Sequence, residues 1–219
     1  MKRILPLVVC VLLAACGSKP IPSWQSVGSN QLESYKQAAL EGKGEVAAMH
    51  FRKAVEEVKK SGDLELLARV HLTRCAVQVA LLEPMDDWEY RQIAAVQAQP
   101  DNQAFHEMLK GDPASVEVEH LPPRYRGFVN AWRKSGPEGA GAEIARMDDP
   151  LSVLIATGLI VKGRHYDARS LNRAVEVSSE KGWKKALLTY LDAQRTYEAQ
   201  AGRPAQSEWI RRKMDLLRD

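Results

Sequence analysis

The sequence predicts an all-α protein, and two observations carry that prediction. First, apolar residues recur at helical spacing over most of the chain, and Gly, Pro or Asp separates one such segment from the next. Second, the alternation typical of a strand occurs only at residues 116–119, which are too few to form a sheet of their own. We therefore expect a stack of amphipathic helices, with residues 116–119 as a loop.

The two helices that follow residue 44 have the clearest patterns. Over residues 45–60, apolar side chains recur on one face and charged side chains occupy the other. Ser61-Gly62-Asp63 then supplies a glycine at which a helix ends and an aspartate that caps the next one. The helix over residues 64–82 is apolar on two sides, which indicates contact with two neighbouring helices.

The middle of the chain predicts shorter helices. Residues 86–97, 103–110 and 138–147 are expected to be helical, as is a segment that opens at Pro122-Pro123 and ends at Ser135-Gly136-Pro137. Gln99-Pro100-Asp101 separates the first two of these helices. The segment 138–147 is weakened by two glycines but keeps an apolar face.

Asp149-Pro150 is a clear helix start, because an aspartate cap precedes a proline whose fixed φ suits the first turn. Residues 151–161 follow and are nearly all apolar, so we expect this helix to be the most enclosed one. Three more helices are expected, over residues 167–181, 183–201 and 205–217. Gly182 and Gly202-Arg203-Pro204 divide them.

An internal similarity links two parts of the chain, because residues 38–72 align with residues 158–192 without a gap. The identical pairs include Ala54 with Ala174, Val55 with Val175, Glu56 with Glu176, Gly62 with Gly182 and Leu67 with Leu187. Short helical segments also agree by chance, since Ala, Val and Glu are common in helices. We favour a true repeat over coincidence.

Gly42, Ala47, Phe51 and Ala54 follow the spacing of a turn glycine, a small residue, an aromatic residue and a second small residue. This pattern resembles the tetratricopeptide-repeat family and its looser relatives. The resemblance implies an α-solenoid of antiparallel helix pairs, whose concave groove binds protein. We expect the solenoid to be irregular, because the family's early Trp, Leu and Gly are absent and Asp167 replaces the small residue of the second copy.

The chain begins with Lys2 and Arg3, an apolar run over residues 4–12 and the sequence Leu-Ala-Ala-Cys at residues 13–16. This order is that of a secretory signal, and the run is too short to span a membrane. Leu-Ala-Ala-Cys resembles the lipobox of bacterial prolipoproteins. The resemblance implies cleavage before Cys16, diacylglycerol on its sulfur and an acyl chain such as palmitate on its new amine. An ordinary signal peptide is the alternative.

These signals predict a lipoprotein signal peptide (residues 1–15), a lipidated cysteine with a flexible tether (residues 16–30) and a TPR-like helical domain (residues 31–219). The tether is rich in Gly, Pro and Ser and lacks helical periodicity. Two or more acyl chains hold a protein stably on a bilayer, so the membrane is an expected partner. Gly17 stands where many inner-membrane lipoproteins carry Asp, which favours the periplasmic face of the outer membrane.

Charge and cysteine content limit which molecules the protein is expected to bind and which disulfides it can form. Without residues 1–15 the chain carries 29 basic and 28 acidic residues, so its net charge is about +1 and we expect no nucleic-acid binding. Cys10 leaves with the signal and Cys16 carries lipid, so Cys75 has no partner for an intrachain disulfide. Cys75 lies on an apolar helix face and is expected to be buried, with a reactive thiol as the alternative.

No sequence pattern points to catalysis. The motifs of zinc proteases, phosphate loops and nucleophile elbows are absent, and no two histidines are spaced for a helix-borne metal site. His71 is expected at the edge of the core. Glu117, Glu119 and His120 form the one local cluster of acids and imidazole, which a solvated loop also explains. We therefore expect no enzyme, and we assign no catalytic residue, metal or cofactor.

The candidate partner-binding residues are Arg124, Tyr125, Arg126 and Arg133, which combine basic and aromatic side chains around one helix. Such a surface would bind an acidic peptide or lipid headgroups. The alternative is a solvated face with Tyr125 turned inward. Three tryptophans, at positions 88, 183 and 209, are expected to fill the seams between helix pairs.

Taken together, these features predict a membrane-anchored periplasmic lipoprotein that acts as a scaffold, or as an assembly or stability factor, for another envelope protein. The alternative is an envelope enzyme that acts on peptidoglycan or lipid. A deep pocket with clustered carboxylates or histidines would favour the enzyme, whereas a long open groove lined by successive helices would favour the scaffold. Self-association for structural reasons is a third hypothesis.

Overall fold

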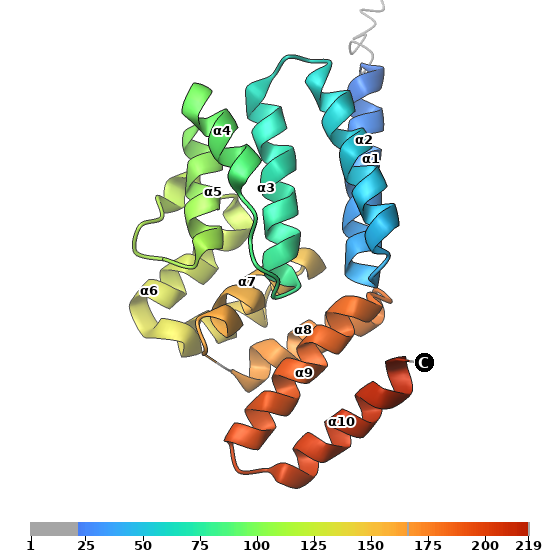
Figure 1. Cartoon of the computed structure of the whole chain (residues 1–219). Coiled ribbons are helices and arrows are strands. Elements are labelled where there is room, and N and C mark those ends of the chain that lie inside the picture. Colours follow the sequence, from blue (N-terminus) through green and yellow to red (C-terminus); the bar gives the residue numbers. More distant parts are fainter. Residues whose placement is uncertain (1–21, 166, 219) are drawn as a thin grey trace, which may run out of the picture.

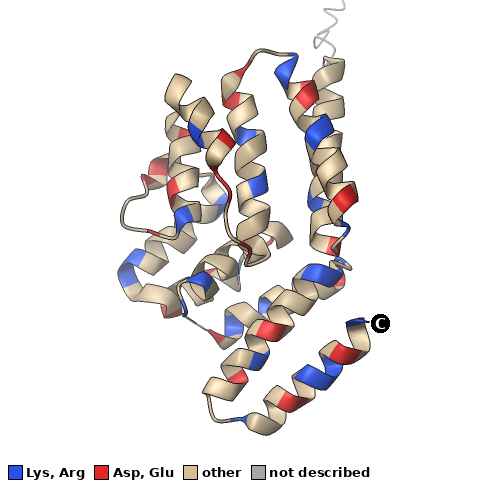
Figure 2. Cartoon of the chain, viewed as in Figure 1, with Lys and Arg blue, Asp and Glu red and all other residues tan. Residues whose placement is uncertain are grey.

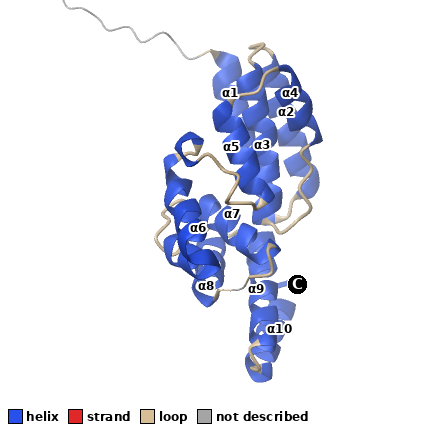
Figure 3. Ribbon diagram, turned by 90° about the vertical axis from the view of Figure 1, so that its left-hand side faces the viewer, coloured by secondary structure: helices blue, strands red, loops and turns tan. Residues whose placement is uncertain are grey.

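The computed structural model describes residues 22–165 and 167–218, and this part of the chain contains ten α-helices, one 3₁₀-helix and no strand (Figures 1 and 3). The elements are α1 (Ser23–Glu41), α2 (Gly44–Lys59), α3 (Leu64–Ala80), α4 (Trp88–Val96), α5 (Pro100–Lys110), η1 (Val118–His120), α6 (Pro123–Ile144), α7 (Pro150–Lys162), α8 (Ala168–Glu180), α9 (Lys184–Gln200) and α10 (Pro204–Arg218). The all-α prediction is confirmed. The expected signal peptide and Cys16 lie outside the described residues.

The helices form two tiers. In the upper tier α1, α2 and α3 stand side by side and α4 and α5 lie beside α3, whereas α7 to α10 cross beneath them (Figure 1). α7 lies at the junction, because it packs against α3, α5, α6 and α8. Basic and acidic residues are distributed over most of the visible helices (Figure 2). Among the described helices, none has both the length and the apolar character that crossing a bilayer requires.

α7 is the most enclosed helix, as its sequence predicts. The Asp149 carboxylate accepts a hydrogen bond of 2.9 Å from the Ser152 backbone N–H, and Pro150 occupies the first turn. The ten residues that follow Leu151 are all buried. At Gly158 the backbone of α3 comes so close that a Cβ would lie 2.3 Å from the Val79 carbonyl oxygen. A glycine is therefore required where α3 and α7 cross.

The internal similarity extends to the helix boundaries. A shift of 120 positions places α3 on α9 residue for residue, and it also superimposes the end of α1 on that of α7 to within one residue. Gly62 and Gly182 end the preceding helices with φ of 68° and 66°. Ala54 and the matching Ala174 are both completely buried. The described helices are thus consistent with a helical-repeat fold.

The prediction of a flexible tether up to residue 30 is wrong for its second half, because α1 begins at Ser23. Ser and Gly are weak helix formers, but packing overrides that preference here. Gly28 is buried against α2, where a Cβ would lie 3.4 Å from the Val58 side chain. The glycine that suggested a flexible segment instead lies within a helix that packs against α2.

Two of the three tryptophan predictions are also wrong. Trp183 is buried, as expected for a seam between helices, but Trp88 and Trp209 are 58% and 55% exposed. They lie on α4 and α10, which are outer helices with one face turned to solvent. Two predictions for the core are confirmed, because His71 and Cys75 are both buried. Burial raises the pKa of the Cys75 thiol to about 12, so this cysteine stays protonated and unreactive at neutral pH.

Two further sequence predictions agree with the structure. Gly136 adopts non-helical dihedral angles (φ 64°, ψ −160°) and kinks α6 at the break expected there. Residues 116–119 form no strand, because they lead into the short η1 helix. α5 begins three residues earlier than expected, since Pro100 occupies its first turn rather than interrupting the chain before it.

Candidate binding groove

The four residues singled out from the sequence have different roles in the structure. Tyr125 is only 1% exposed, and its hydroxyl accepts a hydrogen bond of 3.0 Å from Ser152 Oγ of α7. Burial raises the pKa of Tyr125, which keeps its hydroxyl neutral. The side chain of Tyr125 is therefore too buried to contact a partner protein in this structure. The apolar stripe of α6 that it shares with Phe128 and Val129 faces the core.

Arg126 and Arg133 brace a loop. The Arg126 guanidinium donates hydrogen bonds of 2.9 Å and 2.8 Å to the carbonyls of Leu121 and Glu119, and Arg133 Nε donates one of 2.6 Å to the Pro113 carbonyl. Backbone carbonyls need such donors where no helix or sheet supplies them. Both arginines therefore hold the segment between α5 and α6 in place.

Arg124 is the fourth candidate, and it lies in a groove. Its guanidinium sits 5.4 Å from the centroid of the Tyr125 ring, which fixes it by a cation–π contact, and the side chain remains exposed. Arg126 also lines this groove, but its guanidinium is engaged by backbone carbonyls. Arg124 therefore differs from the other three candidates. It is the one that points to a binding surface.

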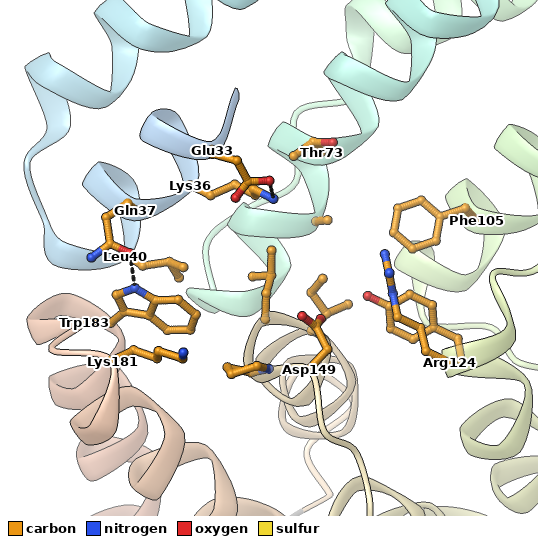
Figure 4. A pocket seen from close by; sticks show the side chains of 15 residues that line it. Glu33, Lys36, Gln37, Leu40, Thr73, Phe105, Arg124, Asp149, Lys181 and Trp183 are labelled. Carbon is orange, nitrogen blue, oxygen red and sulfur yellow. Dashed lines mark hydrogen bonds and ion pairs between the residues drawn. The ribbon is translucent and has the colours of Figure 1, made fainter. Parts of the chain in front are cut away.

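The groove consists of two hollows that share Thr73, Phe105 and Arg124. The first has a volume of about 540 Å³ and is lined by α1, α3, α5, α6, α7 and the turn between α8 and α9 (Figure 4). The second has a volume of about 390 Å³ and continues between α3, α5, η1 and the start of α6. We call the two together the groove. Its walls come from both tiers of helices.

The floor of the groove is apolar. Leu40, Ala76 and Ile155 reach it from α1, α3 and α7, and each is almost completely buried. Phe105 is half-buried, and its ring centroid lies 5.6 Å from that of Tyr125. An occupant that covered Phe105 would therefore bury apolar surface that now faces the groove.

Two polar contacts order one wall of the groove. The Trp183 indole N–H donates a hydrogen bond of 2.7 Å to Gln37 Oε1, which links the turn before α9 to α1. Lys36 forms an ion pair with Glu33 one turn earlier on α1 (Figure 4). The wall is therefore held by contacts between helices that are distant in the sequence.

Three basic side chains of the groove form no ion pair within the described residues. Lys181 and Arg124 are exposed and lie on opposite sides of the hollow in Figure 4. Arg126, at the other end of the groove, contacts only backbone carbonyls. The groove thus combines an apolar floor with cations at its rim.

The carboxylates of the groove are mostly engaged. Asp149 caps α7, and Asp101 Oδ1 lies 2.9 Å from His120 Nδ1. In the part of the chain that the structure covers, no three His, Cys, Asp or Glu side chains gather as metal ligands. The arrangement is that of a groove between several helices of the two tiers, with its carboxylates mostly engaged.

Most residues of the groove could not be found from the sequence. Lys36, Thr73, Phe105 and Lys181 lie on four different elements and share no spacing. The one signal for them was indirect, because a helical-repeat fold places its binding surface along its inner helices. Glu117, Glu119 and His120 lie at η1, where Glu119 and His120 line one end of the groove.

Comparison with known protein families, with curated proteins and with solved structures finds no match to this chain.

Proposed function

We propose that this protein is an envelope lipoprotein whose helical domain holds a segment of another envelope protein in the groove, and so helps that protein to assemble, localise or remain stable. The observation that carries the proposal is the groove itself. Its walls come from helices of both tiers, and its two hollows join at Thr73, Phe105 and Arg124. Such surfaces suit extended segments of protein.

The lining of the groove supports this assignment. Burial of apolar surface at Phe105 and Leu151 would supply binding energy, while Gln37, Thr73 and the cations at the rim would orient the segment. Trp183 is already fixed by Gln37, so little side-chain entropy is lost at that wall when a segment binds.

The lipobox supports the location. Only residues 17–22 separate Cys16 from α1, and six residues span at most about 20 Å. A lipidated Cys16 would therefore hold the groove close to the bilayer, where envelope proteins are assembled. Replacement of Cys16 by Ser tests the anchor: we expect the protein to leave the membrane fraction or to stall as a precursor. Unchanged partitioning into detergent would contradict lipidation.

Site-specific photo-crosslinking in cells tests the groove. Thr73 lies where the two hollows meet, and its hydroxyl donates to the Arg69 carbonyl four residues earlier. Thr189 on α9 is a matched control, because it is also half-buried, makes the same bond to Lys185 and lies outside the groove. We expect benzoylphenylalanine at position 73 to form a covalent adduct with one envelope protein.

The control position defines the outcome. Benzoylphenylalanine at position 189 should give little or no adduct, since that side chain lies away from the groove. Adducts at neither position, or the same mixture of adducts at both, would contradict the proposed function. Thermal melting of each variant by circular dichroism checks that the substitution leaves the fold intact.

A further inference from the structure

The charges of the groove indicate which kind of segment it holds. The carboxylate of Glu33 is paired with Lys36, and that of Asp101 contacts His120. Asp149 accepts hydrogen bonds at the N-terminus of α7, where the helix dipole compensates a negative charge. Glu33 is thus paired with a cation, and Asp101 and Asp149 are in contact with hydrogen-bonding groups of the protein itself.

The cations of the groove are compensated less completely. Arg69 is paired with Glu65, but Arg124, Arg126 and Lys181 have no carboxylate partner within the described residues. Two acidic side chains of the groove, Glu119 and Asp149, are likewise without an ion pair in this part of the chain, and Asp149 caps α7. Three cations without a carboxylate partner therefore face two acidic side chains without an ion pair, one of which is a helix cap.

The positions of these cations matter as much as their number. In Figure 4 Lys181 lies beside Trp183 on one side of the hollow and Arg124 lies beside Phe105 on the other, with the apolar floor and the capping carboxylate of Asp149 between them. An extended segment that crossed the floor would place its ends near these two cations. Acidic residues at those ends would find partners, whereas basic residues would be repelled.

We infer that the groove binds an acidic segment of its partner, in which Asp or Glu residues flank apolar ones. This inference rests on the proposed function and names the chemistry of the segment. The apolar residues cover Phe105 and the floor, and the flanking carboxylates pair with Arg124 and Lys181. The near-neutral surface outside the groove then adds no general attraction for anions, so selectivity resides in the groove.

The adduct formed at position 73 tests the inference directly. Digestion of that adduct and sequencing by mass spectrometry identify the partner segment attached to the groove. We expect a segment with a net negative charge and at least one large apolar residue. A neutral or basic segment would overturn the inference while the proposed function stood. Absence of any adduct would contradict both the inference and the proposed function.

Charge variants give a second readout. Arg124→Glu/Lys181→Glu reverses the two cations, and Arg124→Gln/Lys181→Gln removes them more gently, because Lys181 lies at the C-terminal end of α8 where a negative charge is unfavourable. Lys53→Glu/Lys134→Glu is the matched control: both lysines are exposed, unpaired in the described structure and outside the groove. We expect the groove variants to lower adduct yield about tenfold and the control to leave it within about twofold.

Peptide binding to the purified protein completes the test. The probes are two fluorescein-labelled peptides of the same apolar residues, Glu-Leu-Glu-Phe-Glu-Leu-Glu and its counterpart with Lys in place of Glu, measured by fluorescence anisotropy. We expect the Glu peptide to bind more tightly, with an affinity that falls as salt is added and in the Arg124→Gln/Lys181→Gln variant. Failure of the Glu peptide to bind more tightly than the Lys peptide would overturn the inference, as would equal binding to the groove and control variants.

Discussion

The segment α1–α3 and the segment α7–α9 share the ends of their three helices to within one residue, but not their surroundings. Glu33 and Lys36 of α1 form one wall of the groove, whereas Val153 and Ala156 occupy the matching positions of α7 and are completely buried. The reverse holds for the third helices, because nine residues of α3 are buried but only four of α9. α3 and α7 lie together at the centre of the molecule.

This difference shows that helix ends and residue burial have different origins in the sequence. Helix boundaries follow from local signals, such as Gly62 and Gly182, which both segments retain. Burial follows from the place of a helix in the stack. α1 is an edge helix with a polar face, whereas α7 is a core helix. The groove arises where an edge helix lies opposite a core helix. Substitutions at matching positions should therefore have unequal effects.

The largest effect is expected where the two segments cross. Gly158→Ala would place a Cβ 2.3 Å from the Val79 carbonyl oxygen, so α3 and α7 must separate. We expect the free energy of unfolding to fall by about 3 kcal/mol, measured by urea denaturation followed with circular dichroism. Gly44→Ala is the control: a Cβ there meets nothing within 4 Å, and stability should change by no more than about 1 kcal/mol. Equal effects would show that the crossing is not tight.

The second prediction compares the matching positions 153 and 33. Val153→Ala removes two buried methyl groups from α7 and should lower the free energy of unfolding by about 2 kcal/mol. Glu33→Ala at the edge of α1 should change it by no more than about 0.5 kcal/mol, because the exposed ion pair with Lys36 contributes little. Both are measured by urea denaturation. A similar loss in the two variants would mean that α1 is as constrained as α7.

The third prediction concerns the N-terminal cap of the third helix, which α3 has and the matching helix α9 lacks. Asp63 accepts a hydrogen bond of 3.1 Å from the Leu66 backbone N–H and caps α3, whereas Trp183 stands at the matching position and α9 has no side-chain cap. Asp63→Ala should lower the free energy of unfolding by about 1 kcal/mol in a thermal melt. Asp148→Ala, at an exposed position beside a helix start, should have no more than half that effect.

The sequence was sufficient for the helices and insufficient for the groove. Asp149-Pro150 and Gly136 act within one or two turns, so the start of α7 and the kink of α6 were predictable. The prediction of a flexible tether around Gly28 was wrong, because Gly28 packs against residues of α2 that lie about thirty positions further along the chain. Arg126 and Arg133 misled for a related reason: the carbonyls that they satisfy belong to a loop whose geometry no local pattern reveals.

The smallest expected effect is a dependence of stability on pH that arises in only one of the two segments. His71 of α3 is buried, and burial lowers its pKa, whereas the matching residue of α9 is the buried Leu191, which does not titrate. The unfolded chain takes up a proton at an ordinary histidine pKa of about 6.5 before the folded protein does. Stability should therefore fall as the pH drops below about 6.5. His71→Leu should lose that part of the decline, measured as urea midpoints between pH 7.5 and 5.5.

The variant should also be at least as stable at pH 7.5, because His71 Nδ1 is buried without a hydrogen-bond partner and leucine removes that penalty. His165→Asn is the control for the loss of an exposed histidine, and its urea midpoints are measured over the same pH range. If His71→Leu instead kept the full decline between pH 7.5 and 5.5, the folded protein would protonate His71 as readily as the unfolded chain does. Water would then reach the imidazole in the folded protein.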